Sequence, residues 1–150
     1  MNDVANLVDV ERVLESHGYN VTLNENSVMV SVGNEKAPFP CVIVMDDVNL
    51  TVSCEIATWG DMVKRIGPKE SEDFFLSLLD MNSQILPYAF SVLTDIDGED
   101  EDRDEWPVVL IDSIPVGDIS ENELLSAMTS LNAALLTAKN LFSVSLVELL

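Results

Sequence analysis

The sequence predicts an α+β fold in which three helices pack on an antiparallel sheet, in the order α-ββββ-α-ββ-α. Two observations lead to this prediction. Apolar residues recur with helical spacing in three separate segments, and six other runs have the composition or alternation of strands. Because successive strand runs can fold back as hairpins, the pattern indicates α+β rather than a parallel βαβ sheet. We expect one domain over residues 1–150.

The first helix is predicted from about Val4 to His17. Leu7, Val10 and Leu14 lie on one side of it, and Gly18 is a natural C-terminal stop. His17 is the single histidine of the chain and falls in the last turn of this helix. A capping or surface role, in which a positive imidazole favours the helix dipole, is therefore expected rather than catalysis.

Two hairpins follow, and each can be tested by its register. Closing the first around residues 24–27 sets Leu23 opposite Val28 and Val21 opposite Val30, so both pairs are apolar. Closing the second around Asp47 and Val48 gives one entirely apolar face. Its pairs are Met45 with Leu50, Ile43 with Val52, Cys41 with Cys54 and Phe39 with Ile56. A two-residue turn prefers Asn-Gly, so a wider loop with a shifted register is the alternative.

The second helix is predicted from Gly67-Pro68 to about Leu86, where Pro87 ends it. Its stripe consists of Phe74, Leu78, Met81 and Ile85, and Phe75, Leu79 and Leu86 broaden that stripe.

Strands at 88–94 and 106–112 come next. Ser120 and Glu123 then form a capping box that begins the last helix. The apolar residues of this helix step by four and three: Leu124, Met128, Leu131, Leu135, Ala138 and Phe142. The terminal residues 143–150 either extend the helix or return as an edge strand.

The stretch DIDGEDEDRDE, residues 95–105, holds eight carboxylates and one arginine. As a calcium loop with Gly98 at its sixth position it would have Leu93, which lacks a side-chain oxygen, at position 1 and Asp104 instead of glutamate at position 12. We therefore expect a solvated acidic loop in a hairpin, not a metal site.

Charge and composition exclude several classes of function. The net charge is −20, from 27 acids against 7 bases, and such a surface repels nucleic acids and anionic membranes. Asp3, Asp9 and Glu11 stand where a signal peptide needs bases, and no apolar run reaches the roughly 18 residues of a membrane span. A cytoplasmic protein is expected, with Cys41 and Cys54 as buried, reduced thiols.

No catalytic constellation is visible. The glycines are isolated, no serine stands in a nucleophile elbow, and the many acids make any chosen carboxylate pair arbitrary. Neither an enzyme, nor a cofactor, nor a metal site is expected. Lys64, Arg65 and Lys69 are interpreted as local neutralisation of an acidic surface rather than as a receptor for an acidic partner.

The apolar stripes of the second and third helices are the most informative feature. One sheet face covered by two helices leaves one stripe without a partner, so a two-fold homodimer is expected to bury it. The interface predicted for this dimer consists of Phe74, Leu78, Met81, Ile85, Phe90 and Val92.

Two segments carry a family resemblance: FFLSLLDMNSQILPYAFSVL and VVLIDSIPVGDISENELLSAMTSLNAALLTA. With the order of elements, they resemble the class I type III secretion chaperones and the YbjN-like bacterial proteins that share that fold. Residues 70–140 are also similar to an uncharacterised YjfI-like family. Four strands before the second helix, where the chaperones show three, and the acidic loop depart from the chaperone pattern.

The resemblance implies a dimer that binds an extended segment of a partner protein along apolar patches, without ATP. The patch assigned to this role consists of Leu7, Val10, Leu14, Val21 and Val30. Two other classes remain open. One is an acidic mimic of nucleic acid that binds a basic protein, or a stress-linked adaptor of the YbjN-like or YjfI-like type. The other is a metal-buffering or small-ligand protein.

Overall fold

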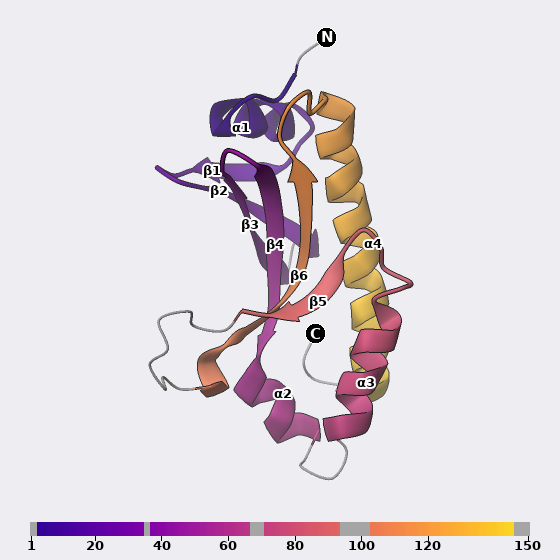
Figure 1. Cartoon of the computed structure of the whole chain (residues 1–150). Coiled ribbons are helices and arrows are strands. Elements are labelled where there is room, and N and C mark those ends of the chain that lie inside the picture. Colours follow the sequence, from indigo (N-terminus) through magenta and orange to yellow (C-terminus); the bar gives the residue numbers. More distant parts are fainter. Residues whose placement is uncertain (1–2, 35–36, 67–70, 94–102, 146–150) are drawn as a thin grey trace.

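The computed structural model describes residues 3–34, 37–66, 71–93 and 103–145 of the chain (Figure 1). Its elements in chain order are α1 (Leu7–Ser16), β1 (Asn20–Leu23), β2 (Val28–Asn34), β3 (Ala37–Met45), β4 (Asn49–Thr58), α2 (Trp59–Ile66), α3 (Ser71–Met81), β5 (Ala89–Val92), the 3-10 turn η1 (Arg103–Glu105), β6 (Pro107–Pro115) and α4 (Glu121–Ser145).

The strands form one six-stranded sheet in the order β1-β2-β3-β4-β6-β5, and every neighbouring pair is antiparallel. The α+β class and the succession of hairpins predicted from the sequence are therefore confirmed. Strands β1 and β5 are the two edges of the sheet, and the long helix α4 runs beside it (Figure 1).

The hairpin registers follow the predicted apolar pairing. Val21 faces Val30 and Leu23 faces Val28 in the first hairpin. In the second, the ladder runs from the pair Cys41–Cys54 to the pair Met45–Leu50, as predicted. The predicted pair Phe39–Ile56 lies beyond that ladder, because β4 bulges between Glu55 and Ala57 where it pairs with β6.

Asp46 explains how the second hairpin turns tightly without Asn-Gly. Its carboxylate accepts the backbone N–H groups of Asn49 and Val48, each at 2.7 Å. These two donors, that of Asn49 first, hold the pKa of Asp46 below its ordinary value. These hydrogen bonds from the turn backbone to the Asp46 side chain stabilise the turn, although the sequence has no Asn-Gly pair there to adopt the left-handed conformation.

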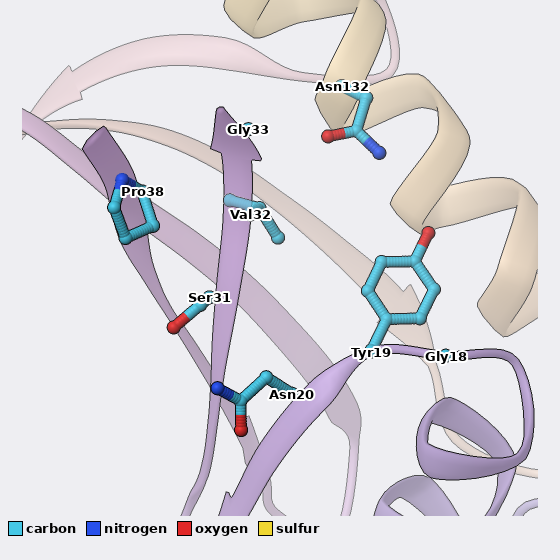
Figure 2. A pocket seen from close by; sticks show the side chains of 8 residues that line it. All are labelled: Gly18, Tyr19, Asn20, Ser31, Val32, Gly33, Pro38 and Asn132. Atoms are coloured by element: carbon cyan, nitrogen blue, oxygen red, sulfur yellow. The ribbon is translucent and has the colours of Figure 1, made fainter. Parts of the chain in front are cut away.

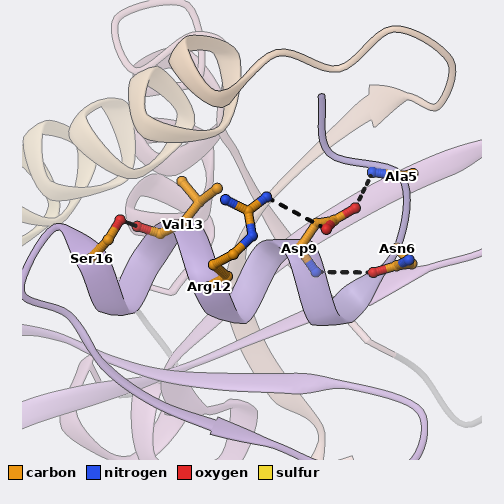
Figure 3. Close-up of polar contacts among 6 residues, drawn as sticks. All are labelled: Ala5, Asn6, Asp9, Arg12, Val13 and Ser16. Carbon is orange, nitrogen blue, oxygen red and sulfur yellow. Dashed lines mark hydrogen bonds and ion pairs between the residues drawn. The ribbon is translucent and has the colours of Figure 1, made fainter. Parts of the chain in front are cut away.

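Helix α1 is shorter than predicted, because its first turn is set by a cap at Asn6. The Asn6 side chain accepts the Asp9 N–H at 2.9 Å, and the Asp9 carboxylate accepts the Ala5 N–H at 2.9 Å (Figure 3). This bond to Ala5 is the main cause that lowers the pKa of Asp9. Val4 precedes the helix and donates its N–H to the Ile119 carbonyl at 2.8 Å, which pins the entering chain beside the start of α4.

The second predicted helix corresponds to α3, and α2, which precedes the predicted range, was not predicted. Helix α3 ends at Met81 rather than near Leu86. The Asn82 side chain leaves the helix to accept the Phe90 N–H at 2.7 Å, and Gln84 donates its N–H to the Met81 carbonyl in a closing turn. A tertiary hydrogen bond thus ends the helix before the proline does.

The last helix begins as predicted. Glu123 donates its N–H to the Ser120 hydroxyl at 3.1 Å, and the Glu123 carboxylate accepts the Ser120 N–H at 3.3 Å, so the capping box is confirmed. The predicted stripe from Leu124 to Ala138 is buried, whereas the structure describes the backbone of Phe142 and not its side chain.

The core lies between α4 and one face of the sheet. One cross-strand row of this face contains Val30, Cys41, Cys54 and Leu110, all of them buried. Tyr88 is fully buried, and its hydroxyl donates to the Ala127 carbonyl at 2.9 Å, which ties the start of β5 to α4. The alternate residues of each strand point to the opposite face of the sheet, where Met29 and Val44 remain 42% exposed.

Gly60 gives a test of how α2 and η1 pack. A Cβ atom at Gly60 would lie 2.6 Å from the Asp104 Cβ and 2.9 Å from the Asp104 carbonyl oxygen. Although alanine normally stabilises a helix interior relative to glycine, Gly60→Ala is expected to lower the free energy of unfolding by about 1–3 kcal/mol through overpacking. Urea denaturation measures this. Lys64→Ala, an exposed position of α2, is the control, and a stabilised Gly60→Ala variant would contradict the packing.

Candidate functional site

An apolar groove of about 220 Å³ opens where α2 and α3 meet the edge of the sheet. It is lined by the following residues of α2, α3, β5 and β6: Trp59, Phe75, Leu78, Leu79, Phe90, Ser91, Val92 and Val108. Ser91 supplies the only hydroxyl among these side chains. The groove therefore offers van der Waals contact and no acid–base chemistry.

Two aromatic rings form one wall of the groove. The Trp59 indole and the Phe75 ring are stacked, with centroids 4.5 Å apart and planes 12° apart. The backbone at Trp59 is fixed in place, because the Trp59 backbone N–H donates to the Trp106 carbonyl at 2.8 Å and the neighbouring Gly60 packs against η1. This wall is thus built by α2, α3 and the chain that enters β6.

Helix α3 presents one apolar face to the core and a second to the groove. Phe74 and Leu78 are buried, with Leu78 only 5% exposed. Phe75 and Leu79, one turn apart, lie along the groove, and Leu79 is 65% exposed. Leu76, beside them, is 64% exposed. Solvent thus reaches a contiguous apolar surface at this end of the molecule, which marks a candidate interaction site.

The edge strand next to the groove is partly protected. Phe90 directs its N–H away from β6, where the Asn82 side chain accepts it. Strand β5 is also only four residues long. Short length and a capped N–H group both hinder pairing with a further strand. The groove is therefore better suited to side chains of a partner than to extension of the sheet.

The predicted interface residues are close together, but most serve the core of one chain. Phe74, Leu78, Ile85 and Phe90 are buried, and Met81 and Val92 are partly buried. Of these six, Leu78, Phe90 and Val92 line the groove. Sequence reasoning placed Phe75 and Leu79 only at the margin of the stripe, although their spacing of four already suggested a second face. Trp59 was missed entirely.

The predicted partner-binding patch needs a correction. Val10, Leu14 and Val30 are buried in the core of the chain itself, so they are not available on its surface. Leu7 and Val21 are partly buried and pack against that core. The stripe of α1 is amphipathic because the helix closes one end of the sheet, and this folding role accounts for the pattern.

A second cavity, of about 500 Å³, is polar and lies near the start of β1. Its lining consists of Gly18, Tyr19, Asn20, Ser31, Val32, Gly33, Pro38 and Asn132 (Figure 2). The cavity forms because β1 pairs with β2 only as far as Asn20–Ser31, while the Tyr19 ring turns toward α4 (Figure 2). These lining residues carry no charged group, and the Tyr19 phenol is the one titratable side chain among them.

The other candidate groups have structural environments. Cys41 and Cys54 are free and fully buried. Desolvation raises the pKa of the Cys41 thiol far above its ordinary value and that of the Cys54 thiol to about 12. His17 lies beside the Val13 carbonyl, with Nδ1 at 2.9 Å, and its Nε2 is 3.9 Å from the Glu121 carboxylate. It therefore joins the end of α1 to the start of α4.

The structure bears on metal binding and membrane insertion only for the described residues. Within them, no cluster of three or more His, Cys, Asp or Glu side chains is arranged to hold a metal ion. In the same residues, no helix has the length and hydropathy needed to cross a membrane. Of the acidic loop 95–105, residues 95–102 lie outside the described part, and its last three residues form η1.

Comparison with solved structures shows the fold. The crystal structure of an uncharacterized protein from Methanothermobacter thermautotrophicus matches with a TM-score of 0.57 and 13% identity, over 85% of this chain and 90% of the other. The crystal structure of YbjN from E. coli, described as a proposed transcription regulator, matches with a TM-score of 0.55 and 13% identity, over 91% and 96%. The chain thus has a YbjN-like fold. No protein-family model matches the sequence, and no curated protein is significantly similar to it.

Asn82 is predicted to stabilise the junction of α3 and β5. Asn82→Ala leaves the partly buried Phe90 N–H without this acceptor and is expected to cost about 1–2 kcal/mol of unfolding free energy. Asn82→Asp keeps an oxygen at the same position and is expected to retain most of the stability. Chemical denaturation of the three proteins measures the difference, and equal losses in both variants would contradict this role of the side chain.

The two thiols are predicted to be unreactive in the folded protein. Burial and a raised pKa leave almost no thiolate at neutral pH, and the thiolate is the nucleophile. A thiol-reactive chromogenic disulfide is expected to modify neither cysteine in native buffer and both in denaturant. Rapid modification of either cysteine in native buffer would show that this part of the core opens.

Proposed function

We propose that the protein is a non-enzymatic binding module. Its groove receives a large apolar side chain from an extended segment of a partner protein. The single observation that carries the proposal is the solvent-accessible apolar groove with a stacked Trp59–Phe75 wall and an exposed Leu79 rim. Aromatic anchors in apolar pockets contribute most of the binding energy in many protein interfaces.

The volume of the groove sets the size of what it can hold. An apolar cavity of about 150 Å³ accommodates a benzene-sized molecule. The groove, at about 220 Å³, therefore suits one large apolar side chain such as Phe or Leu, not a folded domain. The flanking chain of the partner then passes over the exposed residues of α3.

The charge of the chain supports a binding role. A net charge of −20 keeps molecules apart, so an open apolar groove is compatible with solubility. YbjN is described as a proposed transcription regulator. If this chain has a comparable role, its charge disfavours direct contact with DNA and favours action through a protein.

Two alternative functions predict different results in binding experiments. The homodimer expected from the sequence remains a prediction, and a second copy is the competing occupant of the same groove. The acidic mimic of nucleic acid is favoured by the net charge alone. It would bind a basic protein through charge and would be indifferent to the groove side chains.

The proposal is tested by selecting short displayed peptides on the purified protein and measuring the affinity of those selected. Binders are expected to share one large apolar residue. Because Leu79→Lys places a charge at the apolar rim, it should weaken binding about tenfold or more. Leu136→Lys on α4 is the matched control, since Leu136 is 62% exposed and lies outside the groove, and it should bind like the wild type.

Analytical sedimentation of the wild type, Leu79→Lys and Leu136→Lys distinguishes a partner peptide from a second copy of the chain as the occupant of the groove. A monomer that binds apolar peptides through Leu79 supports the proposal. A dimer that Leu79→Lys dissociates, without any peptide binding, would assign the groove to a second copy. Equal peptide binding by all three proteins would show that the groove is not the peptide-binding site.

A further inference from the structure

We infer that the segment bound in the groove is cationic, with lysine or arginine residues flanking its apolar anchor. This inference rests on the proposed function and specifies the chemistry of the partner. It follows from the charges that surround the groove, which differ from the neutral, apolar groups that line it.

Carboxylates stand on two of the elements that border the groove. Asp73 and Asp80 are exposed on α3, the helix that contributes Phe75 and Leu79 to the lining. Asp104 and Glu105 are exposed in η1, which packs directly on α2 at Gly60, next to the Trp59 wall. Negative charge therefore lies on α3 and on η1, two elements that pack next to the aromatic wall.

Among the side chains that the structure describes, none forms an ion pair with these four carboxylates. Within the described part of the chain there are two ion pairs, Arg12–Asp9 and His17–Glu121, and both involve α1. Figure 1 shows α1 at the opposite end of the molecule from α2 and α3. A partner that brings positive charge to the groove would relieve repulsion among carboxylates and would be steered toward it.

The turn η1 begins with Arg103, and the other bases on the elements that border the groove lie on α2. Lys64 is exposed there and Arg65 follows it, whereas α3 contains Glu72, Asp73 and Asp80 and no base. The positive flanks of the segment are therefore expected over α3 rather than over α2, and η1, with Asp104 and Glu105 against Arg103, adds a smaller negative charge. This asymmetry gives the bound segment a preferred placement.

The same charges disfavour a second copy in the groove. Each copy carries a net charge of −20, so a symmetric interface here would bring the acids of two α3 helices together. Like charges across an interface oppose association, most strongly within about 10 Å at moderate salt. A cationic segment of another protein meets no such penalty.

The test uses three synthetic peptides that share one central Phe in a serine background. Their flanking residues are Lys, Ser or Glu. The Lys peptide is expected to bind about tenfold more tightly than the Ser peptide at low salt, and the Glu peptide more weakly than both. Calorimetry gives the affinities, and tryptophan fluorescence reports engagement of the Trp59 wall. High salt should narrow the difference between the Lys and Ser peptides.

Matched variants separate a local effect from attraction to the whole acidic molecule. The groove triple is Asp73→Asn, Asp80→Asn and Glu105→Gln. The distant triple is Glu15→Gln, Glu25→Gln and Asp47→Asn, and it changes the net charge by the same amount. The groove triple should lose most of the preference for the Lys peptide, and the distant triple should keep it. Equal losses in both triples, or none in either, would overturn the inference.

Failure of this inference is distinguishable from failure of the proposed function. If the Lys, Ser and Glu peptides bind equally and all lose affinity with Leu79→Lys, the groove binds apolar segments without a charge preference. The inference then fails and the proposed function stands. If no peptide responds to Leu79→Lys, or if a peptide with Ser in place of the central Phe binds as well, both fail.

Discussion

The pairing of β4 with β6 is the interaction on which the rest of the structure depends. It joins residues 49–58 to residues 107–115 and links the hairpins of the first half of the chain to the second half. Apart from β6 itself, which contributes Val108, the elements that border the groove, from α2 to η1, lie between these two strands in the sequence. The pairing of β4 with β6 therefore brings together the two ends of the segment that forms the groove. At the end of this pairing, Thr58 pairs with Pro107, and the next residue, Trp59, bonds to the Trp106 carbonyl.

The segment closed in this way explains why the groove is apolar in so acidic a chain. Helix α3 stabilises the fold through Phe74 and Leu78, and the hydrophobic gain from burying them fixes the direction of the whole helix. Once it is fixed, Phe75 and Leu79 must point to the other side, toward the Trp59 wall. A substitution of Leu78 would consequently damage the fold together with any binding, whereas Leu79 reports on binding almost alone.

Local patterns predicted the elements that local interactions determine. The hairpin pairs follow from alternation, and the start of α4 follows from Ser120 and Glu123, because these groups act within a few residues of each other. Helix α2 could not be predicted in this way. It spans only eight residues. The presence of glycine at position 60 is explained only by the close contact with Asp104, which lies 44 positions further along the sequence. The groove was missed for the same reason, since its Trp59 wall exists only after β4 and β6 have paired.

The fold shared with YbjN does not by itself carry the site. The likeness extends over 91% of this chain, but 13% identity leaves most side chains different. A sheet of this kind is held by alternating apolar positions that many residues can occupy, whereas a groove depends on particular rings and rims. The stacked Trp59 and Phe75, the exposed Leu79 and the acids of α3 and η1 are properties of this sequence. What the protein binds must therefore be decided at those side chains, because the backbone that it shares with other proteins is compatible with many functions.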